Sequence, residues 1–310
     1  MTISRRKWLG WSLGAGAAAL TAGWRSRVFA GNAPAGAPNV TVIPSSGEAL
    51  PCVGMGTVDY RGSGSGDGMD ALKETLRAFY DLGGRVLDTS PNYGNSEEVL
   101  GGLLNDIGIR DDMWIATKVD REDPKEGAVR MDGSFERLRG PIQLMQVHNL
   151  RGVDAQLPML RDWKAQGRFR YIGVTTHRVE QHDEIMRYMR EWPLDFVQVN
   201  YSVSDRAAAD RLLPLAQDRG IAVLVNRPFG DGRLFGATRD LPLPEWAADM
   251  DATSWAQVML KYILGHPAAT LPIPGTTKPH HARDNAAAMY GRLPDAAMRK
   301  EIERFFDGLA

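Results

Sequence analysis

The feature that most constrains the fold is a regular alternation of short apolar runs with longer segments of helical spacing. In one such segment the apolar residues are Met69, Leu72, Leu76 and Tyr80, and several segments end at a glycine. Eight apolar runs read as strands: 51–57, 85–88, 113–118, 142–148, 170–175, 196–200, 221–226 and 270–273. A strand and a helix repeated eight times with right-handed crossovers predict an α/β fold, a single (β/α)₈ TIM barrel.

The barrel is expected to span residues 39–310, with a hairpin formed by residues 39–43 and 51–55 at its start. Residues 31–38, rich in Gly, Pro and Ala, are interpreted as a linker. A doubly wound open sheet is the competing architecture. It is disfavoured because no G-x-G-x-x-G follows the first strand, and the glycines of 62–68 are better read as a flexible loop.

Composition favours a globular protein that acts on a small molecule. Of the 310 residues, 43% are hydrophobic and 24% are charged, and the formal net charge is −1, so nothing indicates nucleic acid as a partner. The single cysteine, Cys52, excludes an intramolecular disulfide and any multi-thiolate metal cluster.

Residues 1–30 have the layout of a secretory signal. They hold an apolar stretch rich in Gly and Ala, flanked by basic residues and free of acids. The basic residues are Arg5, Arg6, Lys7, Arg25 and Arg27. The run S-R-R-K-W-L resembles the twin-arginine export motif, with Trp where Phe is usual.

Cleavage after Ala30 would lower the net charge from −1 to −6. The resemblance implies a partner in the twin-arginine export machinery, a periplasmic or otherwise exported location, and a cofactor loaded before export. A membrane anchor is the alternative if the signal is not cleaved, although the stretch is short and weakly apolar for a span. The processed protein is expected to have no stable membrane span.

Four ionisable residues are predicted to lie at one end of the barrel. Asp88, Lys118 and His148 close three successive strands, and Tyr93 follows in the loop after Asp88. Each alone has a structural explanation, such as capping, packing or surface charge. Together, at consecutive strand ends, they favour a catalytic tetrad, because active sites of this fold lie at the carboxyl ends of the strands.

This set suits the reduction of a carbonyl, which needs a hydride at carbon and a proton at oxygen. The phenol of Tyr93 would donate the proton, and the ammonium of Lys118 would lower the phenol's pKa. Asp88 would hold Lys118 in place, and a neutral His148 would orient the carbonyl oxygen.

The residues 88–98, D-T-S-P-N-Y-G-N-S-E-E, with Leu100 and Gly101, resemble the signature of the aldo-keto reductase family, in which the aspartate and the tyrosine are catalytic. Thr117-Lys118 and Gln146-Val147-His148 are similar to the family's lysine and histidine strands. The resemblance spans residues from about 39 to 310. It implies NADPH-dependent reduction of an aldehyde or ketone.

The resemblance also assigns the cofactor site. It implies that Thr175, Thr176 and Gln198 hold the nicotinamide carboxamide, with Thr176 replacing the usual Asn. The segment expected to wrap the adenosine end contributes Thr276, Thr277, Lys278, Arg283 and Asn285. Lys278 and Arg283 can neutralise a ribose 2′-phosphate, so NADP is favoured over NAD.

One residue at the expected nicotinamide site departs from the family pattern. Asn226 stands where the family places an aromatic residue that stacks on the ring. Either Asn226 and Arg227 hold the ring and the pyrophosphate by hydrogen bonds, or the geometry of the bound cofactor differs from that of the family. The departure leaves a second hypothesis open, a nucleotide-binding redox sensor with vestigial catalysis. A metal-dependent hydrolase is less favoured, because no H-x-H or H-E-x-x-H occurs and no metal site is expected.

Overall fold

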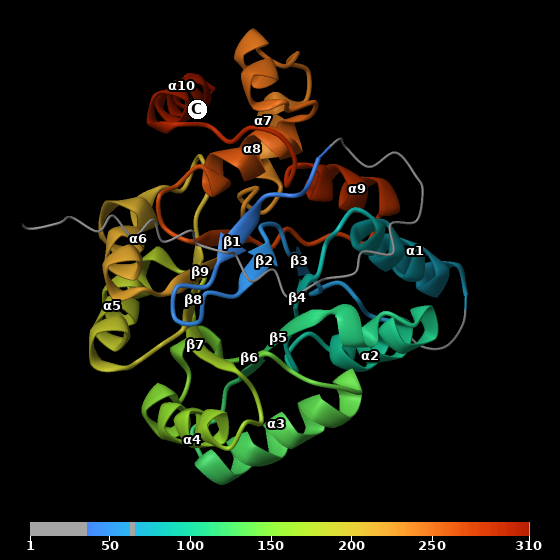
Figure 1. The fold of residues 1–310 in the computed structure, drawn as a ribbon, viewed down its shortest axis with the longest axis vertical. Coiled ribbons are helices and arrows are strands. Elements are labelled where there is room, and N and C mark those ends of the chain that lie inside the picture. Colours follow the sequence, from blue (N-terminus) through green and yellow to red (C-terminus); the bar gives the residue numbers. More distant parts are fainter. Residues whose placement is uncertain (1–35, 63–65, 310) are drawn as a thin grey trace, which may run out of the picture.

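The expected barrel forms from eight parallel strands. The computed structural model describes residues 36–62 and 66–309. Each strand pairs with its neighbours in chain order from β3 to β10, and helices surround the sheet (Figure 1). The barrel strands are β3 (Met55–Gly56), β4 (Val86–Asp88), β5 (Trp114–Val119), β6 (Leu144–Val147), β7 (Tyr171–Thr175), β8 (Phe196–Asn200), β9 (Ala222–Asn226) and β10 (Thr270–Pro272). Seven of the eight predicted runs contain a whole strand, and β5 extends one residue beyond its run, to Val119.

The sheet closes between its first and last strands. The amides of Gly54 and Gly56 donate to the carbonyls of Pro272 at 2.9 Å and Pro274 at 3.2 Å, and Gly56 forms a parallel bridge with Gly275. A Cβ on Gly54 would lie 2.9 Å from the side chain of Ile273. Glycine is therefore needed here because the two strands approach too closely for a larger residue.

Helices follow the strands as the apolar spacing predicted. Those that wrap the barrel are α1 (Asp67–Asp81), α2 (Ser96–Ile107), α3 (Pro124–Leu138), α4 (Val153–Ala165), α5 (His182–Glu191), α6 (Ala207–Arg219), α8 (Trp255–Leu264) and α9 (Pro279–Ala287). A short α7 (Arg233–Thr238) lies between β9 and α8, and α10 (Ala296–Asp307) ends the described chain. Gly220 caps α6 in the left-handed conformation, as its position predicted.

The hairpin seals the amino-terminal end of the barrel. Its strands are β1 (Val40–Val42) and β2 (Ala49–Pro51), so the second strand ends at Pro51 rather than spanning 51–55 as expected. Ile43 and Leu50 join the apolar cluster inside the barrel, where they meet Trp114 and Tyr171. The larger apolar cluster fills the space between the strands and the surrounding helices. With one end plugged, only the carboxyl end is left to hold a site.

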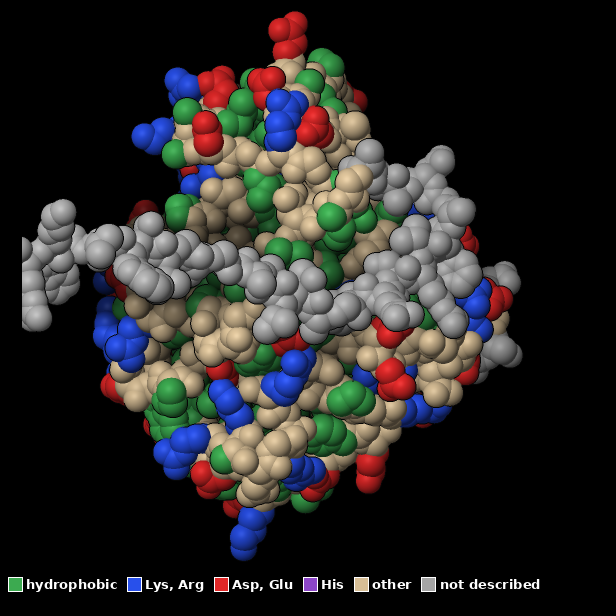
Figure 2. All heavy atoms as spheres, in the orientation of Figure 1, with side chains coloured by type: hydrophobic (Ala, Val, Ile, Leu, Met, Phe, Trp, Pro, Cys, Tyr) green, Lys and Arg blue, Asp and Glu red, His purple; other side chains and the backbone are tan. Residues whose placement is uncertain are grey.

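Charges of both signs are interspersed over the part of the surface in Figure 2 that belongs to described residues. Within residues 36–62 and 66–309, no helix combines the length and the apolar character that crossing a membrane requires. The predicted signal, residues 1–30, and most of the predicted linker lie outside the described part of the chain.

Candidate active site

The inward-facing side chains of the barrel strands change from apolar at the amino-terminal end to polar at the carboxyl end. Side chains alternate along a strand, so residues two apart face the same side. Trp114 and Leu144 belong to the cluster inside the barrel, and Phe196 does also. Two or four residues further on, toward the carboxyl ends, the same faces present buried polar side chains. These are Asp88, Lys118, Gln146, Thr175 and Gln198.

Asp88 is the centre of this layer. Its Oδ2 lies 2.7 Å from Lys118 Nζ, while its Oδ1 accepts from Gln198 Nε2 at 2.9 Å and from Gln146 Nε2 at 3.4 Å. Lys118 Nζ also donates to the carbonyl of Thr89 at 2.7 Å. Both charged side chains are almost fully buried, so these contacts replace the water that they lose.

Tyr93 lies beside this ion pair. Lys118 Nζ is 5.1 Å from the centre of the Tyr93 ring. Burial would lower the pKa of Lys118, but the charge and hydrogen bond of Asp88, together with the contact to the Tyr93 hydroxyl, outweigh it and raise that pKa above its usual value, so the ammonium persists. Burial raises the pKa of Tyr93, and Lys118 only partly offsets it. The expected role of Lys118 is thus present, but the net direction of the Tyr93 shift is opposite to the expected one because burial dominates.

His148 follows β6 directly and faces Tyr93. The two rings meet edge to face, with their centres 6.0 Å apart. Burial, together with the positive charges of Lys118, His177 and Arg130, lowers the pKa of His148 to about 3. The imidazole is therefore neutral near pH 7, as its proposed role of orienting a carbonyl requires.

The residues expected around the nicotinamide lie at the ends of β7, β8 and β9. Thr175 Oγ1 accepts from the amide of Asn149 at 3.0 Å, and the Thr176 hydroxyl donates to Gln181. Asn226 Nδ2 donates to the carbonyl of Thr176 at 2.9 Å, while its buried Oδ1 has no partner among the described residues. That unpaired acceptor fits an additional donor, such as the amide or a hydroxyl of a nucleotide.

Gln198, which the family resemblance assigned to the nicotinamide carboxamide, has its amide nitrogen directed at Asp88. Arg227 is exposed, pairs with Asp231 at 3.3 Å, and has a φ of 51° in the left-handed region. The turn Gly230-Asp231-Gly232 therefore follows a residue whose backbone conformation non-glycine residues seldom adopt.

The residues expected at the adenosine end form a second group after β10. Thr276 and Thr277 are half-buried, Lys278 is exposed, and Pro279 begins α9. No side chain caps the start of this helix, so its first backbone N–H groups point outward. Arg283 is exposed and forms a 3.6 Å pair with Glu74, whereas Asn285 is buried. This arrangement of N–H groups and positive charges can bind a phosphate group.

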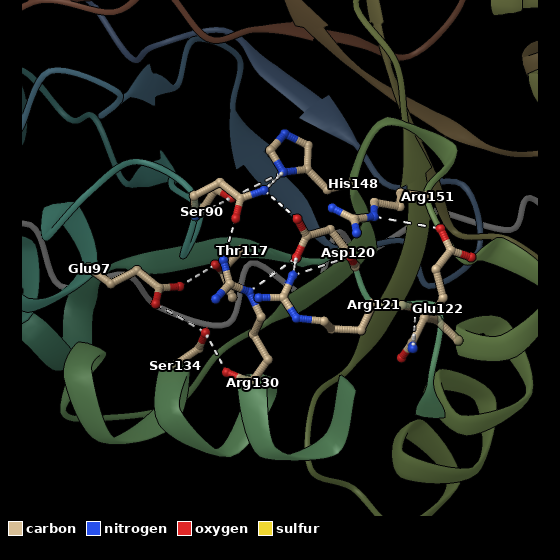
Figure 3. Close-up of polar contacts among 12 residues, drawn as sticks. Ser90, Glu97, Thr117, Asp120, Arg121, Glu122, Arg130, Ser134, His148 and Arg151 are labelled. Atoms are coloured by element: carbon tan, nitrogen blue, oxygen red, sulfur yellow. Dashed lines mark hydrogen bonds and ion pairs between the residues drawn. The ribbon is translucent and has the colours of Figure 1, made fainter. Parts of the chain in front are cut away.

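Sequence reasoning missed several polar residues around the tetrad. Gln146 binds Asp88, and two residues, Ser90 and Asn92, contact His148. Asp120, which bonds Asn92, is likewise buried after β5 (Figure 3). Strand alternation could have found Gln146 and Asp120, since both continue the inward-facing series of their strands.

Among the described residues, no group of three or more His, Cys, Asp or Glu side chains is arranged to hold a metal ion.

The sequence matches the model of the aldo/keto reductase family over residues 52–304. An aldo-keto reductase of Bacillus subtilis, YhdN, is 29% identical over 214 residues, which cover 63% of this chain and 63% of that protein. The match thus spans less than two thirds of that relative's length. The NADH-specific methylglyoxal reductase of Escherichia coli is 26% identical over 279 residues, covering 72% of this chain and 84% of that protein.

Solved structures share the architecture. An aldo/keto reductase from Klebsiella pneumoniae, crystallised with NADP and acetate, superposes with a TM-score of 0.72 at 24% identity, covering 86% of this chain and 95% of that one. A Klebsiella pneumoniae structure with NADPH also gives 0.72, at 23% identity and coverage of 87% and 96%. These likenesses establish the fold. Because the family model matches most of the sequence, the chain belongs to the aldo/keto reductase family of oxidoreductases.

Proposed function

We propose that this protein reduces an aldehyde or ketone to an alcohol with NADPH. The observation that carries the proposal is the buried Asp88–Lys118 pair beside Tyr93, with a neutral His148 whose ring meets the tyrosine edge to face. The fold places all four at the open end of the barrel. Family membership supports the same reaction class.

In this mechanism Tyr93 donates its proton to the carbonyl oxygen. The phenolate that results lies next to the ammonium of Lys118, which stabilises it, and Asp88 keeps Lys118 charged and in place. His148 donates a hydrogen bond to the same oxygen and orients the carbonyl. The reduced nicotinamide, when bound, supplies the hydride. Solvent then returns a proton to Tyr93.

Tyr93→Phe should remove the proton donor and leave the fold intact. General acids contribute about 10²–10⁴-fold to a rate, so we expect kcat to fall within that range. The measurement is the loss of reduced nicotinamide absorbance with methylglyoxal and an aromatic aldehyde as probes. Tyr188→Phe is the matched control, because its hydroxyl faces Asp154 on the outer helices.

Unchanged turnover in Tyr93→Phe would exclude this tyrosine as the donor. If the unaltered protein holds nucleotide but turns over no carbonyl in a broad panel, the nucleotide-binding redox sensor replaces the reductase. Two structural features support that alternative. The Thr176 hydroxyl is already bonded to Gln181, and Asn226, in place of an aromatic residue, donates to the carbonyl of Thr176.

The choice of NADPH rests on Lys278 and Arg283. Both are exposed at the start of α9, where uncapped N–H groups also favour phosphate. One relative is named NADH-specific, and two similar structures hold NADP or NADPH. The preference of this protein for one of the two nucleotides therefore has to be judged from its own residues.

In the double variant Lys278→Ala/Arg283→Ala we expect the KM for NADPH to rise roughly tenfold or more, since a hydrogen bond to a charged group contributes about 1.5–3 kcal/mol. The KM for NADH should change little, because NADH lacks the 2′-phosphate. Lys300→Ala/Arg304→Ala on α10, which also removes two positive charges, serves as the charge-matched control. An equal loss for both nucleotides would show that these side chains do not read the 2′-phosphate.

We further propose that residues 1–30 are a twin-arginine signal that delivers the folded protein to the periplasm. Arg5 and Arg6, the weakly apolar stretch behind them and the small residue Ala30 support this. Export after folding would carry bound NADP outward, and turnover outside the cytoplasm would then depend on how the bound nucleotide is reduced.

Arg5→Lys/Arg6→Lys should retain the full chain in the cytoplasm of a host with this export route, whereas Arg25→Lys/Arg27→Lys should be exported normally. Fractionation and mass spectrometry of the periplasmic protein check the location, the cleavage site and the bound nucleotide. Equal export of the first variant would refute twin-arginine recognition. Uncleaved protein in the membrane fraction would instead identify an anchor.

A further inference from the structure

The amide of Asn92 lies among three charged or polar side chains beside the tetrad. Its Nδ2 is 2.5 Å from Asp120 Oδ2 and 3.3 Å from His148 Nδ1, and its Oδ1 accepts from Arg130. Arg130 Nε also lies 3.1 Å from Asp120 Oδ1. Arg130 comes from α3, Asp120 follows β5 and His148 follows β6, and Figure 3 shows these three side chains together. Their contacts with Asn92 thus bring three segments to one amide.

These neighbours allow only one orientation of the amide. If Asn92 were turned over, its oxygen would face the Asp120 carboxylate and its NH₂ would face the Arg130 guanidinium, and both contacts would be repulsive. The NH₂ group therefore faces both Asp120 and His148. Since an NH₂ group can only donate, a hydrogen bond from Asn92 Nδ2 to His148 makes Nδ1 the acceptor and leaves that nitrogen without a proton.

We propose that Asn92, oriented by Asp120 and Arg130, is a positioning residue that fixes the proton of His148 on Nε2. A neutral imidazole has one N–H, and excluding it from Nδ1 leaves Nε2 as the donor. The benefit for carbonyl orientation rests on the proposed function, whereas the position of the proton follows from the contacts alone.

Two further observations agree with this assignment. Ser90 Oγ, which accepts from the backbone N–H of Asn92 at 3.1 Å, lies 3.2 Å from His148 Nδ1 and can donate its hydroxyl hydrogen to it. His148 Nε2 makes no hydrogen bond to any described residue, and the ring nitrogen opposite the Ser90 contact points away from the network in Figure 3. The low pKa of His148, about 3, keeps the ring neutral.

The test is ¹⁵N NMR of histidine-labelled protein, with the His148 signals assigned by their loss in His148→Gln. The native chain should show the proton on Nε2. In Asn92→Asp/Asp120→Asn, where the second change removes the carboxylate that would repel the first, a group that can only accept replaces the donor opposite Nδ1, so Nδ1 should become protonated. In alkaline buffer, where the imidazole is neutral, kcat should fall on the order of 10²-fold, as for loss of one oxyanion donor, with the KM for NADPH unchanged.

Two control variants distinguish a role of Asn92 in placing the His148 proton from a general role in supporting its loop. Asn95→Asp makes the same chemical change three residues along the chain, where the amide contacts Gly62, and it should keep the native tautomer. Ser90→Ala removes the other donor but keeps Asn92, so it should also keep the proton on Nε2.

A native proton on Nδ1, a proton that stays on Nε2 in Asn92→Asp/Asp120→Asn, or a tautomer change in Ser90→Ala would overturn the proposal. If the expected tautomers are seen but the native protein reduces no carbonyl, the proposed function fails while the role of Asn92 in placing the proton stands.

Discussion

The buried ion pair of Asp88 and Lys118 organises the open end of the barrel. Two charges removed from water are costly unless every remaining polar atom finds a partner. Here the carboxylate also accepts from Gln198 and Gln146, and the ammonium also donates to Thr89. Strands β5, β6 and β8 are thus tied to one carboxylate at the end of β4. Displacing Asp88 would leave Lys118 buried and unpaired and would move it relative to Tyr93.

The barrel shields the Asp88–Lys118 pair from bulk water. The hairpin and the ring of Trp114, Tyr171 and Phe196 close the amino-terminal end with apolar side chains. Water can therefore approach the polar layer only from the carboxyl end, where Tyr93 and His148 lie. The same low-dielectric surroundings that raise the pKa of Tyr93 strengthen its interaction with Lys118 and keep His148 neutral.

Much of this arrangement is predictable from sequence because it depends on periodicity. Each of the eight apolar runs coincides with a strand to within a few residues, and parallel strands in chain order bring Asp88, Lys118 and His148 to one rim. Side-chain geometry is less accessible to such reasoning. The net direction of the Tyr93 pKa shift depends on how far burial exceeds the effect of Lys118. The orientation of Asn92 depends on contacts with residues far away in the chain.

The most direct measurement is the pKa of Tyr93 itself, followed by ¹³C NMR of tyrosine-labelled protein in the native chain and in Lys118→Gln. Lys118 opposes the effect of burial, so the pKa of Tyr93 should rise further in the variant, and kcat should fall with it. Thermal unfolding would establish that the variant is folded. An unchanged Tyr93 pKa in a folded Lys118→Gln protein would contradict the account, because Lys118 would then have no part in preparing the proton donor.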